Sequence, residues 1–130
     1  MALGGTSFKM RSSTSLDPFA SAKFTTAAAY TAGDMTKLED TVGVIVNTVA
    51  SGYQGVLVYR ATRILVPCVA VTSGNLGDFT IFCKVYFDAT NEEVTTVAAG
   101  NTLCGTVHVT PSVGDETVLI DLDGRLGIVA

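Results

Sequence analysis

The sequence predicts an all-β protein, a small antiparallel jelly roll, sandwich or barrel that follows an extended N-terminal arm. Valine and threonine recur throughout, with 13 glycines and only three prolines among 130 residues, a composition typical of strands joined by glycine-marked turns. Polar turn residues separate short apolar segments at near-regular intervals, which is typical of sandwiches and barrels. No segment shows a helical period that outweighs a strand assignment.

The chain length and charge indicate one domain that works with a partner. A chain of 130 residues buries about two-thirds of the surface that its unfolded form exposes, so it can build a core without disulfides. Charged residues make up only 15% of it, which is low for a surface that faces water alone. We therefore expect one β domain, residues 24–130, that covers part of its surface with another protein.

The first half of the β domain is expected to contain strands at residues 24–30, 42–46, 56–60 and 64–66. The segment 42–46 is rich in valine, and glycines at the turn near 51–55 separate it from the next strand. Residues 61–63 carry no turn signal, so two of these strands can run into one another. Pro67 ends that ladder or lies at a sheet edge.

The second half is expected to contain strands at residues 69–72, 79–88, 94–96, 106–110 and 118–123. The segment 79–88 is the longest apolar run, and its aromatic and β-branched residues favour strand over helix. The last two segments alternate apolar and polar residues, so one face of each should point into the core. The residues predicted to point inward are Val42, Val44, Val46, Val107, Val109, Val118, Ile120 and Leu122.

The N-terminal arm, residues 1–23, differs from the rest of the chain. It carries a net charge of +2, while residues 24–130 carry −6. It has no clean periodicity, yet it holds large apolar side chains that a purely soluble tail would not need. We expect the arm to become ordered against a partner. The candidate partner-binding residues are Phe8, Lys9, Met10, Arg11, Leu16 and Phe19 in the arm, with Arg60 and Arg63 at a strand junction.

The sequence shows no catalytic or metal-binding constellation. His108 is the only histidine and lies on the face opposite Val107 and Val109, so a surface or interface role is favoured over a catalytic pair with a cysteine. Asp121 and Asp123 share a strand face, where they are better explained as an acidic, soluble face than as a cation site. We predict a protein without catalytic residues, cofactor or metal.

Cysteine usage and charge indicate the redox compartment of the protein and the kinds of partner it can bind. Cys68, Cys83 and Cys104 are odd in number and widely spaced, which argues against a disulfide framework and for reduced, structural thiols in a cytoplasmic product. The acidic body disfavours binding to a nucleic acid backbone. No apolar run is long enough to span a bilayer, and the first residues do not read as a signal peptide. We expect neither a nucleic acid nor a membrane partner.

The order of the turns and strands resembles a known family. Residues 85–89 read Val-Tyr-Phe-Asp-Ala, residues 94–96 read Val-Thr-Thr, residues 100–105 read Gly-Asn-Thr-Leu-Cys-Gly and residues 122–124 read Leu-Asp-Gly. This succession is similar to the closing pattern of the small proteins that decorate or cement the capsids of tailed bacteriophages. The earlier Ala-Gly-Asp at 32–34 and Thr-Val-Gly-Val at 41–44 are compatible with it. The resemblance covers residues 24–124.

The resemblance implies a structural role. A cement protein of this kind would bind the lattice of the major capsid protein on the outer surface of the virion, after synthesis in the host cytoplasm, and would stabilise the phage head. It would act as a homo-oligomer, and we favour a homodimer over a homotrimer because an acidic last strand and an arm suit an isologous pair. Arm and body together would give multivalent attachment.

Two other classes stay open on sequence grounds. One is a small β-barrel enzyme or ligand-binding protein of unknown substrate, which would need polar groups converging in a pocket. A deep pocket that holds His108 and a thiol would favour it, and a flat apolar patch would not. The other is a host adhesion or sheath domain, which a repeat or secretion signal would favour.

Overall fold

The computed structural model describes residues 19–125, which form an almost entirely β structure. The strands are β1 (Phe19–Thr25), β2 (Met35–Leu38), β3 (Thr41–Ile45), β4 (Gln54–Pro67), β5 (Lys84–Asp88), β6 (Glu93–Thr95), β7 (Thr102–Val109) and β8 (Thr117–Asp123). A short 3-10 turn, η1 (Leu76–Asp78), lies before β5. None of the described residues forms a helix long and apolar enough to cross a membrane. The predicted all-β class is confirmed.

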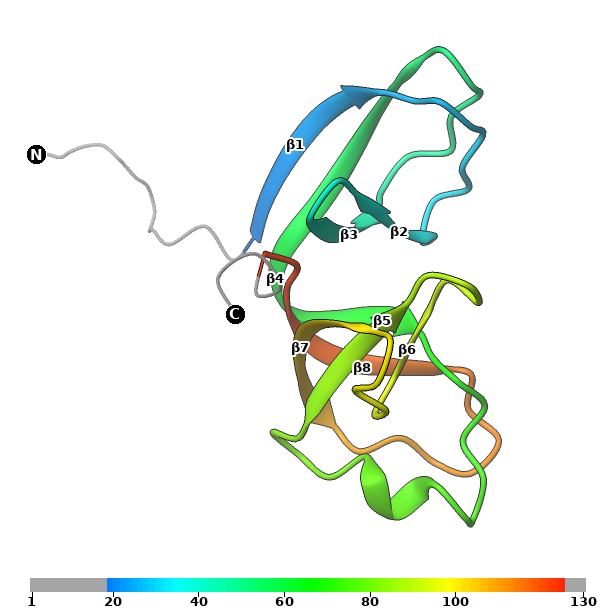
Figure 1. The fold of residues 1–130 in the computed structure, drawn as a ribbon, viewed down its shortest axis with the longest axis vertical. Coiled ribbons are helices and arrows are strands. Elements are labelled where there is room, and N and C mark those ends of the chain that lie inside the picture. The colour runs from blue at the N-terminus through cyan, green and yellow to red at the C-terminus, as the bar shows by residue number, and fades with distance from the viewer. Residues whose placement is uncertain (1–18, 126–130) are drawn as a thin grey trace, which may run out of the picture.

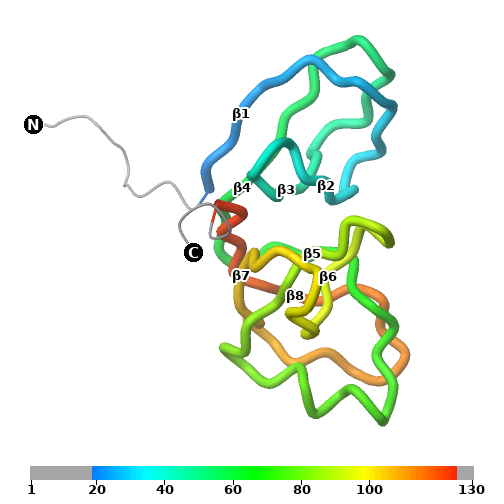
Figure 2. Tube along the Cα trace, viewed as in Figure 1, coloured from blue at the N-terminus to red at the C-terminus, as the bar shows by residue number. Residues whose placement is uncertain are grey.

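One long strand connects two halves of the molecule (Figure 1). β4 has 14 residues, and its first part pairs with β1 and β3 while its second part pairs with β8. All the pairings between named strands are antiparallel, in the order β2-β3-β4-β8-β7-β5-β6 with β1 added on β4. The tube in Figure 2 shows β1, β2 and β3 at one end of this long strand and β5 to β8 at the other.

The second half is nearly closed into a barrel. The chain that follows β4 reaches β6, where Cys68 forms a parallel bridge with Val94. The Val69 N–H donates to the Val94 carbonyl at 3.0 Å, and the Cys68 N–H donates to the Glu116 carbonyl at 2.9 Å. This closure satisfies backbone groups that an open sheet would leave at its edges. The predicted strand at 69–72 does not form, and the isolated bridge beside β6 lies at Cys68, one residue before it.

Both halves share one apolar core. Met35, Val42 and Val44 from the first half belong to the same buried cluster as Phe79 and Val107 from the second. Six of the eight residues predicted to point inward are buried there: Val42, Val44, Val107, Val118, Ile120 and Leu122. Alternation on β8 places the last three of them on one face of that strand.

Two inward predictions are wrong. Val109 is 52% exposed because the pairing of β7 with β8 shifts between Val107 and Val109, and this extra residue turns Val109 to the outer face. Val46 is 47% exposed because β3 ends at Ile45, which is buried in its place. Periodicity could not reveal the exposure of Val46 or Val109, since each depends on where strand pairing shifts or where a strand ends.

The longest predicted strand is also wrong in part. Of residues 79–88, only β5 is a strand, and the preceding residues form a turn in which Phe82 has a φ of 71°. Phe79 is fully buried in the core cluster, whereas Phe82 is 71% exposed. An apolar run therefore combines a core anchor with a surface-exposed turn.

Several strand limits differ from the predicted ones. β2 was not predicted, and β1 begins at Phe19 rather than Phe24. Residues 19–23, assigned to the arm on sequence grounds, pair with β4 from Phe19 opposite Ala61 to Lys23 opposite Val56. Residues 1–18, the rest of the predicted arm, lie outside the described residues.

The two halves are joined by backbone contacts at Gly124. The Val42 N–H of β3 donates to the Gly124 carbonyl at 2.9 Å, and the Gly124 N–H donates to the Tyr59 carbonyl of β4 at 2.6 Å. A Cβ atom at position 124 would lie 1.5 Å from the Val42 carbonyl oxygen. Only glycine allows the end of β8 to approach β3 and β4 this closely.

Candidate interaction surface

The site is built on a bulge in β4. The pairing of β4 with β8 shifts between Ala61 and Ile64, so Thr62 and Arg63 take the place of one residue. Arg63 has a φ of 61°, and its backbone N–H donates to Asp121 Oδ1 at 3.1 Å. A left-handed conformation at a non-glycine residue is unfavourable and persists where surrounding contacts hold it. The bulge bends β4 between the two halves.

A histidine and an aspartate support this bend. His108 Nδ1 lies 3.1 Å from both carboxylate oxygens of Asp121, and both side chains are about one-third exposed. The bulge in β7 turns His108 toward β8, so its partner is a carboxylate that also accepts the Arg63 N–H. The pair therefore ties the bulges of β4 and β7 to one residue of β8, and this arrangement is a structural role for His108.

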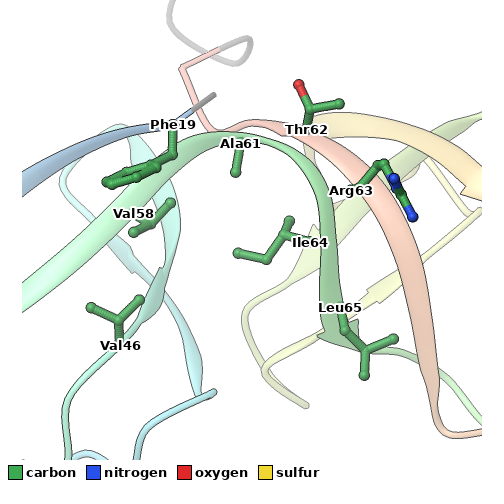
Figure 3. A pocket seen from close by; sticks show the side chains of 8 residues that line it. All are labelled: Phe19, Val46, Val58, Ala61, Thr62, Arg63, Ile64 and Leu65. Carbon is green, nitrogen blue, oxygen red and sulfur yellow. The ribbon is translucent and has the colours of Figure 1, made fainter. Parts of the chain in front are cut away.

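An open apolar groove lies on the concave side of the bend, with a volume of about 510 Å³. Phe19, Val46 and Leu65 are its most exposed apolar walls, between 47% and 58% exposed. Figure 3 shows Val46 and Val58 on one side, Ile64 and Leu65 on the other, and Ala61 between them. The complete lining is Phe19, Val46, Val58, Ala61, Thr62, Arg63, Ile64 and Leu65.

The structure brings three of the predicted partner-binding residues together. Phe19 pairs with Ala61, and the next pair along the ladder joins Ala20 to Arg60. Arg63 follows at the bulge, and both arginines are exposed. Phe8, Lys9, Met10, Arg11 and Leu16 lie outside the described residues. The first residue of β1 and both predicted arginines thus share one region, beside the groove.

Sequence reasoning missed the apolar groove and a second exposed surface. Ile81 and Phe82 are 55% and 71% exposed in the turn before β5, where the Phe82 N–H donates to the Val107 carbonyl at 2.8 Å. A positive φ at an exposed aromatic residue is uncommon. The signal that could have revealed this turn is the length of the run 79–88. Ten residues directly after a loop are long for a single strand.

The acidic residues of β8 are occupied by local contacts. Asp121 contacts His108 and the Arg63 backbone, and Asp123 Oδ1 accepts the Arg125 N–H at 3.2 Å. The guanidinium of Arg125 lies 5.9 Å from the centre of the Tyr59 ring. Within residues 19–125, no group of three or more His, Cys, Asp or Glu side chains is arranged to hold a metal ion.

The cysteines lie in surroundings that suppress the thiolate. Burial raises the pKa of Cys104 to about 12, and burial with the nearby charge of Glu93 raises the pKa of Cys68 to about 11. Burial also raises the pKa of the partly exposed Cys83. A raised pKa removes the nucleophilic form at neutral pH. All three thiols are free.

We expect these thiols to make the protein less stable in alkali. A thiol whose folded pKa is raised stabilises the fold below its unfolded pKa of 9.0, and this stabilisation is lost as the pH rises toward about 11 and 12. Urea unfolding between pH 8 and 11 should show a decline that is smaller in a Cys68→Ala/Cys104→Ala variant. An identical decline in both proteins would contradict this.

Comparison with known proteins identifies one family. A family model described as phage cement protein matches residues 18–122. That span runs from the residue before β1 almost to the end of β8, so it includes the groove, the bulge and both arginines. No curated protein and no solved structure matches the chain.

Proposed function

Because the chain belongs to the phage cement protein family, we propose that it binds the major capsid protein lattice on the outer surface of the capsid and stabilises the phage head. The observation that carries this proposal beyond the family is that Phe19 and Arg63 line one exposed groove, with the exposed Arg60 next to Ala61 on the same strand. Aromatic and arginine side chains are enriched at protein interfaces.

The strand pairing suits a mechanical role. β1 is bonded to β4 along its whole length, from Phe19–Ala61 to Thr25–Gln54, and β4 passes through both halves of the molecule. A pull on the arm along the axis of β1 would load these hydrogen bonds together rather than one at a time. The Gly124 contacts then transmit the load to β3. Arm and body would hold neighbouring capsid subunits with combined strength.

The body offers two classes of contact to a capsid. Arg60 and Arg63 can pair with carboxylates of the major capsid protein, because a guanidinium binds a carboxylate with two hydrogen bonds. Ile81 and Phe82 supply an exposed apolar contact on the other half of the molecule. In the proposed mechanism, Phe8, Lys9, Met10 and Arg11 extend the first contact along the capsid surface.

We favour a homodimer over a homotrimer for the free protein. Among the described residues, β1 pairs with β4 alone, so its second edge has no strand partner. Two such edges related by a twofold axis can pair antiparallel, which makes an isologous contact. A sedimentation experiment on the free protein distinguishes a dimer from a trimer.

In this proposal the protein is made in the host cytoplasm, where its thiols stay reduced, and it works without a catalytic step, cofactor, nucleic acid or membrane. The alternative is a small β-barrel enzyme or ligand-binding protein. Its support is the groove of about 510 Å³, which is within the size range of small-molecule sites. The groove lining contains neither His108 nor a cysteine, and apolar side chains dominate it.

The arm gives the direct test. A Phe8→Ser/Met10→Ser variant should bind decoration-free capsids more than tenfold more weakly than the parent protein, while keeping its thermal midpoint. Burying one large apolar side chain contributes roughly 1.5–3 kcal/mol, and a loss of about 1.4 kcal/mol is a tenfold change in affinity. Co-sedimentation with capsids at several protein concentrations measures this.

Deletion variants provide the controls. Removal of residues 1–18 keeps β1 complete and should weaken capsid binding at least as much as the double substitution. Removal of residues 126–130, at the other end of the chain and outside the family match, should leave binding unchanged. Equal capsid binding by the arm variants and the parent protein would contradict the proposed role of the arm.

A further inference from the structure

The segment that closes the barrel, residues 89–101, has little buried surface. It connects β5 to β7 and contains β6, and we call it the strap. Val94 is its only buried residue, with an exposure of 0%. One edge of β6 pairs with β5, whereas the other edge is held at the isolated Cys68–Val94 bridge, where the Val69 N–H donates to the Val94 carbonyl at 3.0 Å. We call this second contact the seam.

The strap is stabilised by turns of its own. At its start, the Asp88 carboxylate accepts the Thr90 N–H at 2.9 Å and the Asn91 side-chain amide at 2.8 Å. At its end, the Asn101 side-chain amide donates to the Val97 carbonyl at 3.0 Å. These bonds survive a movement of the whole segment, because they do not reach the rest of the molecule. The strap can therefore move as a unit.

Carboxylates flank the seam on both sides. Glu93 precedes Val94 on β6, and Glu116 lies on the other side, where its carbonyl accepts the Cys68 N–H at 2.9 Å. Partial burial raises the pKa of Glu93, and the charges of Asp88 and Glu116 raise it further. Among the residues that the structure describes, no lysine or arginine forms an ion pair with Glu93 or Glu116. Repulsion between like charges thus opposes closure.

We propose that the strap opens and closes as a unit at the seam, with the Val94 side chain as its anchor and the pairing of β6 with β5 as its hinge. In the closed form, Val94 and Cys68 belong to one buried cluster. The open form exposes the Cys68 thiol and separates Glu93 from Glu116. Local opening is expected where few buried apolar contacts hold a segment to the body.

This inference concerns the free protein. It involves neither the groove, the arginines nor the exposed turn before β5, which the proposed function gives to the capsid. Failure of the strap to open would therefore leave the proposed function standing. Loss of the proposed capsid contacts would equally leave the strap unaffected.

Two buried thiols distinguish strap opening from unfolding of the whole domain. Cys68 lies at the seam and is 2% exposed, whereas Cys104 is 0% exposed and lies in β7, which pairs with β5 on one edge and β8 on the other. The closed form hides both thiols from a reagent, and global unfolding exposes both. Strap opening exposes Cys68 while Cys104 stays between its two neighbouring strands.

Thiol labelling in a Cys83→Ala background provides the test. N-ethylmaleimide should modify Cys68 at least tenfold faster than Cys104 under native conditions, with mass spectrometry of the peptides resolving the two sites. Val94→Ala should raise the Cys68 rate roughly tenfold, because it removes buried methyl groups that hold the strap closed. Labelling of Cys68 no faster than Cys104 in the parent protein would overturn the inference.

Val107→Ala is the matched control for the anchor. Val107 is also 0% exposed and belongs to the same core cluster, but it lies at the end of β7 away from the strap. It stays packed when the strap opens, so its loss should speed labelling of Cys104 through global unfolding and leave the Cys68 rate unchanged. Equal acceleration of Cys68 by the two variants would show that only global unfolding reaches this thiol, and would contradict the proposal.

A charge variant tests the second part of the proposal. Glu93→Gln/Glu116→Gln should slow Cys68 labelling about threefold, since it removes repulsion across the seam. Loss of two negative charges would by itself favour the reactive thiolate, so slower labelling reports closure. Glu39→Gln/Asp40→Asn makes the same charge change in the turn between β2 and β3 and should leave the rate unchanged. A Cys68 rate that does not fall in the first variant would refute the role of repulsion.

Discussion

Replacing Gly124 by alanine is expected to lower the thermal midpoint by roughly 10 °C, from a loss of about 3 kcal/mol in unfolding free energy. The added Cβ would lie 1.5 Å from the Val42 carbonyl oxygen and 3.2 Å from the Tyr59 carbonyl oxygen. Both neighbours are backbone atoms, so no side-chain rotation can make room. The cost is the separation of β3 from the end of β8. Thermal unfolding followed by circular dichroism measures it.

Gly77 supplies the matched control for this substitution. It lies in η1, and a Cβ there would meet no heavy atom within 4 Å. Neither glycine has a positive φ, so alanine is sterically accessible to the backbone at both positions. Gly77→Ala should leave the midpoint unchanged or raise it slightly, since alanine restricts the unfolded chain. Similar midpoints for the two variants would refute the role of Gly124 as the joint between the halves.

A second large effect is expected at Phe79. Its side chain is fully buried and is among the largest in the core, and it lies in the chain between η1 and β5. Phe79→Ala should reduce the unfolding free energy by about 3–5 kcal/mol, through lost burial and the cavity left behind. Urea unfolding of the parent and variant proteins measures the loss. Phe79→Leu should give a smaller decrease, because it fills most of the same space.

Phe82 is the control, three positions along the same apolar run. It is 71% exposed and its backbone is already strained at a φ of 71°. Phe82→Ala should change stability by less than about 0.5 kcal/mol. If both phenylalanine variants lost the same free energy, the division of this run into a buried anchor and an exposed turn would be wrong.

Local sequence was enough to predict the all-β class and part of the core. On β8, Val118, Ile120 and Leu122 alternate with less buried residues, and the strand pairs on both edges, so the two-residue period survives unchanged. Val42 and Val44 on β3 are also buried as predicted, although Gly43 and Ile45 beside them are buried as well. The order of turn motifs also indicated the cement family, because turn chemistry is set by residues adjacent in the chain.

The position of the candidate surface depended on tertiary structure. Phe19, Arg60 and Arg63 were each selected from the sequence, but only the pairing of β1 with β4 places Phe19 opposite Ala61, next to Arg60 and two residues from Arg63. The groove between them exists because the bulge at Thr62 and Arg63 bends β4. That bulge is held by Asp121, 58 residues away along the chain from Arg63, a separation that local patterns do not encode.

The sequence by itself thus determined most of the segments that form strands with a buried face, since alternation and turn residues act within a few positions. It could not determine where those strands bend, stop or meet. Val46 and Val109 point outward, and the run from Phe79 to Phe82 leaves the sheet, because neighbouring strands impose bulges and ends at those positions. Long-range pairing made these choices, and it also gathered the residues of the candidate interaction surface.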